Sequence, residues 1–377
     1  MYRKNLLHKF ELEKLTDGQR KFLDRFSSMF KGHPEAVQLA LEIYNNLTNP
    51  LRMSQLPVVV MLAGVSRSGK SHFAKALAYA FHGRKDKSAI IDIQMGQLKT
   101  DRGIFELRGA PPAHHGYIEP AKVAELNPGD LDPSGKLSPH NLRRVVLDSP
   151  LSNEERVVKP SIIRIDEIEK GNEDIQDMFL EVFGEGKLSM SNGLESSFEN
   201  SVFILTANSG VRDLMVRKVG VLETGKRSDD QYESAIFNKI AASFKPEFIN
   251  RISYILIFKP LEDSIIRQIV DIPIAAFQQF LGNLPVGRRF TVEVDESARD
   301  FLFQSVMNES GDLSGLSTAF SFYVETPVGM LVRDGQVKAG DHVMITAGFD
   351  GSDLAMQVIP GNKLATVSVM ESVHFAA

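Results

Sequence analysis

Apolar residues recur at helical spacing through the first 55 residues. Leu12, Leu15, Phe22, Phe26 and Phe30 follow one another at steps of three, seven, four and four residues, which places them along one face of a helix. We expect this face to be buried against the rest of the chain, with a helix that docks a partner as the alternative. The break "NNLTNPLRMSQLP" ends this helical segment.

Short β-rich apolar runs then alternate with helical patterns from residue 56 to about residue 258. This alternation predicts an α/β fold with a mostly parallel sheet and helices on both faces. A helix-rich segment follows to about residue 348 and runs into a strand–turn–strand candidate, "HVMITAGFDGSDLAMQVI". The polar segment 127–160 has the turn residues of a long surface loop. We therefore expect four parts: residues 1–55, 56–258, 259–348 and 349–377, the last a strand or tail.

Composition excludes several classes of site and partner. The 377 residues include no cysteine, so disulfides and cysteine-ligated metal sites are excluded. A net charge of −5 and a pI near 6.0 give no basic field for nucleic acid or an anionic membrane. No apolar run approaches the roughly 18 residues that span a bilayer, and the N-terminus lacks the pattern of a secretory signal. The sequence predicts a soluble cytoplasmic protein with no nucleic acid partner and no membrane insertion.

The stretch "GVSRSGKS" fits the phosphate-loop pattern G-x-x-x-x-G-K-[ST] at every fixed position. It follows a β-rich run and precedes the helical pattern "HFAKALAYAF", which is the strand–loop–helix context that this motif needs. Glycines let backbone N–H groups surround phosphate oxygens, a lysine neutralises the outer phosphates, and a hydroxyl binds Mg²⁺. A chance glycine-rich turn is the alternative. The predicted nucleotide-binding residues are Gly64, Val65, Ser66, Arg67, Ser68, Gly69, Lys70 and Ser71.

Two carboxylates end another apolar run. In "SIIRIDEIEK", Asp166 and Glu167 follow residues that we expect to form a strand beside the phosphate loop. Asp166 is then suited to hold Mg²⁺, directly or through water, and Glu167 to polarise the attacking water of a hydrolysis. Asn208 ends the run "SVFILTAN" and is a candidate to bind that water or the γ-phosphate. Taken alone, an acidic pair such as Asp166 and Glu167 is typical of a helix N-terminus. An asparagine such as Asn208 is, taken alone, typical of a turn.

Six stretches, taken in order, resemble the Clp-type AAA+ protein-unfoldase ATPases, in particular their second nucleotide-binding module. They extend from about residue 30 to residue 348: "FKGHPEAVQLALEI", "AGVSRSGKSHFAKALAYAF", "LRGAPPAHHGYIEP", "IDEIEKGNEDIQDMFLEVFGEGKLS", "FENSVFILTANSG" and "FKPEFINRISYILIFKPL". The resemblance implies a large P-loop AAA+ α/β domain and a smaller α+β lid domain. It also implies a ring of copies of this chain, a hexamer, with ATP bound between neighbours.

The resemblance assigns roles residue by residue. Lys70 and Ser71 match the phosphate-loop pair, whose hydroxyl joins Asp166 in holding Mg²⁺. Glu167 matches the water-activating acid and Asn208 the first sensor. The implied cofactors are therefore ATP and Mg²⁺.

Arg251, in "PEFINRIS", matches the arginine finger that reaches into the nucleotide site of a neighbouring copy. Such a finger makes hydrolysis depend on assembly. Without the surrounding match, an arginine there is typical of a surface salt bridge. The family's small-domain Gly-Ala-Arg element falls on Asp312, Leu313 and Ser314, so its arginine is missing. A short hydroxyl cannot replace a bidentate cation, so another group takes the role, hydrolysis is slow, or nucleotide mainly controls assembly.

His114 stands where the family has the tyrosine of a channel loop that grips a translocating polypeptide. The flanks "LRGAPP" and "GYIEP" are shared, but Ala113, His114, His115 and Gly116 form the centre and Tyr117 comes three residues later. A histidine ring stacks, but it is smaller and partly charged near neutral pH, so we expect a weaker grip unless Tyr117 turns inward. A solvated loop is the alternative. A metal site is disfavoured because adjacent side chains diverge and no nearby ligand completes a shell.

The leading hypothesis is a Mg²⁺-dependent, ATP-hydrolysing ring protein that remodels or unfolds a protein client or partner complex. The alternative is an ATP-controlled assembly or scaffold ring with slow hydrolysis and no polypeptide threading. A small-molecule or nucleic-acid enzyme is disfavoured because the resemblance continues through the small domain. The sequence shows no second ATPase module, extra substrate domain or peptidase-docking loop, so we expect partner docking at the loop 127–160 or the C-terminal tail.

Overall fold

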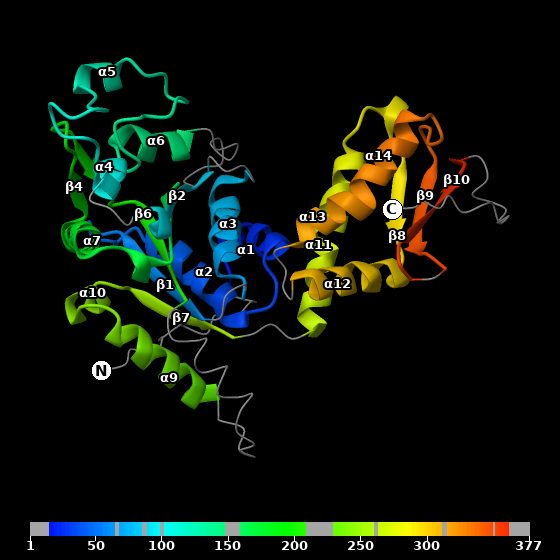
Figure 1. Ribbon diagram of the computed structural model, residues 1–377, viewed down its shortest axis with the longest axis horizontal. Coiled ribbons are helices and arrows are strands. Elements are labelled where there is room, and N and C mark those ends of the chain that lie inside the picture. The colour runs from blue at the N-terminus through cyan, green and yellow to red at the C-terminus, as the bar shows by residue number, and fades with distance from the viewer. Residues whose placement is uncertain are drawn as a thin grey trace. The chain divides into compact units, whose positions relative to one another are not determined.

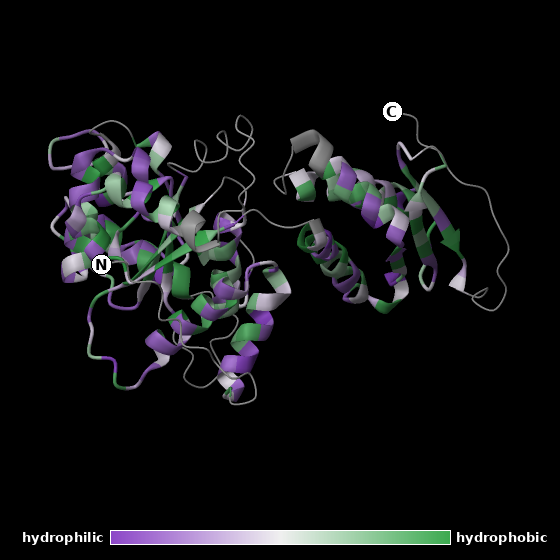
Figure 2. Ribbon diagram, turned by 90° about the horizontal axis from the view of Figure 1, so that it is seen from below, coloured by the Kyte–Doolittle hydropathy of each residue, from purple (hydrophilic) through white to green (hydrophobic). Residues whose placement is uncertain are grey.

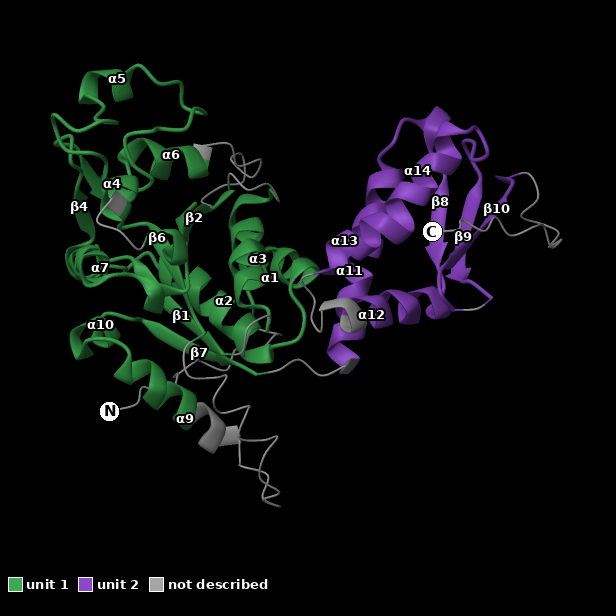
Figure 3. Cartoon of the chain, viewed as in Figure 1, with its two compact units in different colours: residues 1–260 green, residues 261–377 purple. Residues whose placement is uncertain are grey.

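The computed structural model describes residues 15–64, 68–84, 89–98, 102–147, 159–208, 229–259, 263–310, 315–349 and 351–361. Two compact units make up the chain, residues 1–260 and residues 261–377 (Figure 1, Figure 3). The first unit contains the two segments predicted to be an N-terminal helical part and an α/β domain. The second unit contains the other two segments. The finer division at residues 55, 258 and 348 stays a prediction.

A five-stranded parallel sheet forms the centre of the first unit, with the strand order β2-β3-β6-β1-β7. The strands are β2 Ile91–Gln94, β3 Ser161–Asp166, β6 Ser201–Ala207, β1 Val58–Gly64 and β7 Tyr254–Phe258. β1 and β6 are buried along their whole length, as nearly continuous apolar runs predict for strands covered on both faces. The hydropathy colouring shows apolar strands inside the first unit (Figure 2). The predicted α/β fold class is therefore confirmed.

Helices cover both faces of this sheet, because successive side chains of a strand point to opposite sides. Val60 and Leu62 of β1 belong to one apolar core, and Met61 and Ala63 belong to the other. The first core includes side chains of the helices α1 Asp17–Met29, α2 Pro34–Thr48 and α3 Lys70–His82. The second core includes side chains of the helices α6 Pro139–Leu147, α7 Glu173–Glu185, α9 Asp229–Ala242 and α10 Pro246–Asn250.

The aromatic stripe near the N-terminus is a buried face. Phe22 and Phe26 of α1 are fully buried, and the ring of Phe22 lies 4.9 Å from that of Phe81, between centroids. The ring of Phe26 lies 5.5 Å from that of Phe73, which also belongs to α3. The interpretation as a core face is therefore confirmed for these aromatic residues, whereas Leu12 lies outside the described residues.

The segment 127–160 is partly helical. Leu142 and Val145 of α6 belong to the core, and Asn141 Nδ2 donates to the carbonyl oxygens of Asp132 and Gly135 at 2.9 Å each. The prediction of a surface loop is therefore wrong for residues 139–147, because two apolar residues at helical spacing are enough to seat a short helix. Residues 148–158 lie outside the described residues. The shorter elements of this unit are η3 Met95–Gln97, α4 Arg102–Arg108, α5 Pro120–Ala124, η5 Ile168–Lys170, β4 Lys187–Ser189 and β5 Glu195–Ser197.

The second unit has its own apolar core, between helices and a three-stranded sheet of order β10-β9-β8. β8 pairs with β9 in parallel, and β9 pairs with β10 as an antiparallel hairpin, which confirms the predicted strand–turn–strand. No described helix of either unit has the length and apolar character to cross a membrane. The elements of the second unit are α11 Asp263–Gly282, η6 Val286–Arg288, β8 Thr291–Val294, α12 Glu296–Ser310, α13 Leu316–Phe320, η8 Ser321–Glu325, α14 Thr326–Arg333, β9 His342–Ala347 and β10 Leu354–Ile359.

Candidate functional site

The carboxyl ends of three neighbouring strands bring predicted site residues to one edge of the sheet. Gly64 ends β1, Asp166 ends β3, and Asn208 directly follows β6, which lies between those two strands. Neighbouring strands are about 4.8 Å apart, so these three residues, far apart in the sequence, come close together. The carboxyl edge of a parallel sheet is also where ligands bind in such folds.

Two glycines shape the described ends of the predicted phosphate loop. Gly64 has a φ of +143°, and a Cβ there would lie 2.3 Å from the carbonyl oxygen of Phe258, so only glycine fits beside β7. Gly69 has a φ of +100° and is the N-cap of α3, whose N-terminus has no side-chain cap. The first N–H groups of such a helix are available to an anion. Val65, Ser66 and Arg67 lie outside the described residues.

A buried histidine supports the backbone of this loop. His33 Nε2 donates to the carbonyl oxygen of Ser68 at 3.1 Å, and its ring lies 4.5 Å from the ring of Phe258, between centroids. Burial lowers the pKa of His33, so the ring is neutral near pH 7. The sequence patterns did not single out His33, because its role depends on a contact with a residue 35 positions away.

Lys70 begins α3 with only 5% of its surface exposed, and its Nζ donates to the carbonyl oxygen of Gly64 at 3.0 Å. Burial lowers the pKa of Lys70 to about 8, against the opposite effect of the nearby carboxylates of Asp166, Glu169 and Glu167. A buried ammonium group therefore stands at the edge of the sheet where a phosphate-binding cation is expected.

ATP affinity is expected to fall as the pH rises through about 8, because Lys70 must be protonated to neutralise phosphate. The side chain is charged in the free protein at pH 7, but at pH 9 binding has to take up a proton, which costs roughly tenfold in affinity. Equilibrium titrations with ATP at pH 7 and pH 9 measure this change. The Lys70→Met variant should bind ATP weakly at both pH values. Equal wild-type affinities at the two pH values would count against this role of Lys70.

Thr206 ties the acidic pair to the neighbouring strand. Its hydroxyl donates to Asp166 Oδ1 at 2.5 Å, and it accepts the backbone N–H of Glu167 at 3.0 Å. Glu167 has a φ of +54°, which costs a non-glycine residue roughly 1–3 kcal/mol. The two hydrogen bonds of Thr206 hold this strained turn at the edge of the sheet. The signal in the sequence was a hydroxyl residue within an otherwise apolar, buried run, and sequence reasoning missed it.

Both oxygens of the Glu167 carboxylate have polar neighbours. Lys170 Nζ lies 2.6 Å from Oε2, and Asn208 Nδ2 donates to Oε1 at 3.3 Å. The backbone N–H of Asn208 donates to Glu169 Oε1 at 2.9 Å. The structure therefore brings together the two residues predicted to be the water-activating acid and the first sensor. Their catalytic roles stay predictions.

Ser71 and Asp166 are the residues that would hold Mg²⁺. Ser71 stands in the first turn of α3, and Asp166 stands at the end of β3. Hydroxyl and carboxylate oxygens are hard ligands, and Mg²⁺ at a phosphate loop binds substrate phosphates and waters as well, so a large protein cage is not needed. Within the described ranges, no three histidine or acidic side chains gather as a metal site of their own. The residues present fit the ion.

Arg251 lies toward the other end of the sheet. It precedes β7, which runs from Tyr254 to Phe258, and Phe258 pairs with Gly64 at the carboxyl edge. A strand rises about 3.3 Å per residue, so the carboxyl edge at Phe258 is about 13 Å from Tyr254. Arg251 comes before Tyr254 in the chain and is therefore further still from that edge. Its guanidinium group packs against Gly184 of α7: a Cβ atom added to Gly184 would lie 3.3 Å from Cζ of Arg251. Arg251 is therefore remote from the phosphate loop of this chain.

The surroundings of Arg251 are suited to contact with another protein surface. Arg251 and Arg52 line a cavity of about 230 Å³ beside the linker between α2 and β1. Leu51 and Met53 of that linker are 83% and 95% exposed. Among the described residues, Arg251 makes no ion pair. Exposed apolar side chains next to arginines are typical of protein interfaces.

The two histidines of the predicted channel loop are exposed between α4 and α5, whereas Tyr117 is partly buried. The ring of His114 meets that of Phe105 edge-on, 5.5 Å between centroids. Ala113 has a φ of +68°, and the N–H of Tyr117 donates to the carbonyl oxygen of His114 at 3.1 Å, which closes a tight turn. His114 and His115 are therefore the exposed rings of this loop, and Tyr117 is not.

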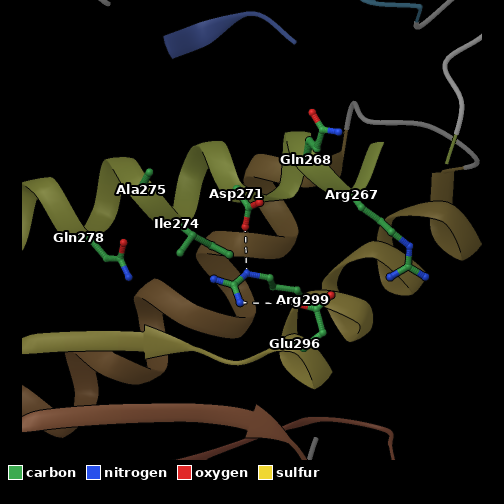
Figure 4. Close-up of a pocket in the computed structure, with 8 residues that line it drawn as sticks. All are labelled: Arg267, Gln268, Asp271, Ile274, Ala275, Gln278, Glu296 and Arg299. Carbon is green, nitrogen blue, oxygen red and sulfur yellow. Dashed lines mark hydrogen bonds and ion pairs between the residues drawn. The ribbon is translucent and has the colours of Figure 1, made fainter. Parts of the chain in front are cut away.

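A separate cavity of about 470 Å³ lies in the second unit between α11 and α12 (Figure 4). Its charged side chains pair with one another: Arg299 Nε donates to Asp271 Oδ1 at 2.9 Å, and Arg299 Nη1 lies 3.8 Å from Glu296. The guanidinium of Arg267 lies over the ring of Phe303, 4.7 Å from its centroid. Because its cations are already engaged, this cavity does not compete with the phosphate loop as a nucleotide site.

Comparison with known proteins supports the features described above. Residues 141–255 match the family described as AAA domain (Cdc48 subfamily). The chain is 29% identical over 338 residues to the chaperone protein ClpB of Aquifex aeolicus, which covers 89% of this chain and 30% of that protein. It is 27% identical over 343 residues to ClpB of Rhodopseudomonas palustris, covering 89% of this chain and 34% of the relative.

A plant relative matches to a similar extent. The chain is 25% identical over 351 residues to the chaperone protein ClpD2, chloroplastic, of Oryza sativa subsp. japonica, covering 90% of this chain and 34% of that protein. The chain thus spans about a third of the length of the curated relatives it matches. These matches confirm the resemblance that the order of the motifs indicates.

Proposed function

Because this chain resembles the Clp-type AAA+ ATPases over 89% of its length, we propose that it binds and hydrolyses ATP in a ring of copies that remodels a protein client or complex. One observation carries the proposal. Lys70, Asp166, Glu167 and Asn208 meet at the carboxyl edge of one parallel sheet, beside the uncapped N-terminus of α3. A buried lysine, two acidic groups and a helix N-terminus without a side-chain cap together favour a phosphate ligand with a divalent cation.

Each residue then has a distinct task. Lys70 and the first N–H groups of α3 neutralise and orient the outer phosphates. Ser71 and Asp166 would hold Mg²⁺, which neutralises charge that develops on the phosphates. Glu167 accepts a proton from the attacking water, and Asn208 fixes the carboxylate and the water relative to each other.

Arg251 supports assembly. Its position toward the end of the sheet away from Gly64 leaves it remote from its own phosphates, so it serves the site of a second copy. The exposed Leu51 and Met53 and the cavity that holds Arg52 form a surface that such a contact would bury. We propose a hexameric ring in the cytoplasm, without nucleic acid.

Assembly of the Glu167→Gln variant with ATP tests this function. The variant should bind ATP and form a closed ring, because nucleotide stays bound between neighbours when hydrolysis is blocked. Native mass determination and electron microscopy measure the number of copies, and identification of co-purifying proteins gives the client. A protein that binds no ATP and forms no ring at high concentration would refute the proposal.

An ATP-controlled scaffold ring is the second candidate. The feature that favours it is the predicted channel loop, in which His114 is exposed and Tyr117 is partly buried. The missing small-domain arginine favours it too, although Asp312, Leu313 and Ser314 lie outside the described residues. A scaffold would form the ring with ATP, hydrolyse slowly and unfold no client.

His114→Tyr is expected to raise client unfolding several-fold, and His114→Ala to lower it, if this loop grips a polypeptide. A tyrosine restores a larger, uncharged ring at an exposed position, whereas alanine removes the ring. Unfolding of a fluorescent client under ATP measures both variants, and Tyr117→Ala tests whether the tyrosine contributes. Ring formation without any client unfolding in all of these proteins would favour the scaffold.

A further inference from the structure

The short turn after Glu167 makes two contacts to which no role has yet been assigned. Lys170 Nζ lies 2.6 Å from Glu167 Oε2, and Glu169 Oε1 accepts the backbone N–H of Asn208 at 2.9 Å. Asn208 Nδ2 in turn donates to Glu167 Oε1 at 3.3 Å. Both charged residues of η5 (Ile168–Lys170) therefore contact one of the two groups proposed to handle the attacking water.

Burial and backbone geometry distinguish this turn from an ordinary surface pair. Glu169 Oε2 and Asn208 Oδ1 are buried, and neither has a hydrogen-bond partner among the described residues. Leaving a buried acceptor without a hydrogen bond costs stability. Glu167, which starts the turn, has the positive φ of +54° already noted. The unpaired acceptors and the positive φ both lower stability, which favours a functional role for this turn.

We propose that Glu169 and Lys170 are positioning residues for hydrolysis. Glu169 holds the backbone of Asn208, and Lys170 holds the Glu167 carboxylate in place through their ion pair. This inference rests on the proposed function, in which Glu167 accepts a proton from water. Neither residue touches the nucleotide in this role, because each acts through the residue that it contacts.

The Glu167 carboxylate is held from two sides. Lys170 of η5 contacts Oε2, and Asn208, which follows β6, contacts Oε1. Without the contact to Lys170, the carboxylate has more freedom to turn away from the attacking water.

Lys170→Met is expected to lower kcat at pH 7 by about two- to fivefold, the usual effect of a partly exposed ion pair. ATP affinity should stay unchanged. Lys170→Arg keeps the ion pair and should restore the rate. If Lys170 had a purely structural role, its loss would lower ATP affinity and Tm together with kcat.

Glu169→Leu is expected to lower kcat by about tenfold with unchanged ATP affinity, because the Asn208 backbone loses a charged acceptor. Glu169→Gln keeps an acceptor oxygen, so its kcat should fall less than that of Glu169→Leu. Lys187→Met is the matched control: it removes a similarly short exposed ion pair, 2.8 Å from Glu195 on the β4–β5 hairpin, and should leave kcat unchanged.

The outcomes separate this inference from the proposed function. If the wild-type protein binds ATP but does not hydrolyse it, both the proposed function and the roles of Glu169 and Lys170 are overturned. If the wild type hydrolyses ATP but Lys170→Met or Glu169→Leu keeps the wild-type kcat, the role of that residue alone is overturned. Loss of ATP affinity and a lower Tm together with the loss of kcat would assign a structural role instead.

Discussion

Arg251→Ala is expected to lower the ATPase rate of the assembled protein by about 10³-fold or more, with nearly unchanged ATP affinity. A guanidinium group supplied by a neighbour stabilises charge on the transferring phosphoryl group. Arg251 stands remote from Gly64 and Asp166 of its own sheet, so the loss falls on the site of the next copy. Steady-state hydrolysis at concentrations where copies associate, with ATP binding measured separately, checks this result.

Mixing two inactive variants provides the control. An Arg251→Ala copy keeps its own Glu167, and a Glu167→Gln copy keeps its own Arg251. In a mixed assembly the second copy supplies the arginine to the first, so part of the activity should return. Full activity of Arg251→Ala alone, or no recovery despite demonstrated co-assembly, would contradict a finger supplied by a neighbour.

Glu167→Gln is expected to lower kcat by about 10²- to 10⁴-fold, the usual contribution of a positioned general base. The amide has nearly the shape of the carboxylate and still meets Asn208, but it cannot accept the proton of the attacking water. ATP affinity should change little, because Lys70 and the start of α3 bind the phosphates. Single-turnover hydrolysis with excess protein separates the chemical step from product release.

Glu173→Gln is the matched control for this substitution. Glu173 lies in the first turn of α7 and is exposed, so the same change of charge there should alter kcat by less than about twofold. Hydrolysis at the wild-type rate in Glu167→Gln would assign proton transfer to another group, and Glu169 would be the first to examine.

Much of the fold could be predicted because buried parallel strands have a distinctive composition. β1, with seven consecutive apolar or small residues, can be covered only by helices on both sides. The helix at Pro139–Leu147 could not be predicted in the same way. Its two core residues, Leu142 and Val145, stand in a polar segment rich in turn residues, and only the packing of the neighbouring elements makes them a buried face.

The residues of the candidate site also fall into those that the sequence predicts and those that it does not. Residues 64–71, Asp166, Glu167 and Asn208 could be named from the sequence because phosphate and metal chemistry demands particular groups at particular places along the chain. Thr206 and His33 could not, since their roles depend on contacts with residues far along the chain, such as Asp166, 40 positions from Thr206, and Ser68, 35 positions from His33. Glu169 and Lys170 stood within the quoted motif, yet their contacts depend on how the turn after Glu167 folds.

The sequence by itself determined which chemical groups this protein has and the order in which they follow one another, because local motifs need only neighbouring residues. It also determined the alternation of strands and helices, through the burial of apolar runs. Only the tertiary structure decided that three strand ends converge and that Arg251 lies away from them. The register and order of parallel strands place each strand end, and they depend on contacts between residues far apart along the chain.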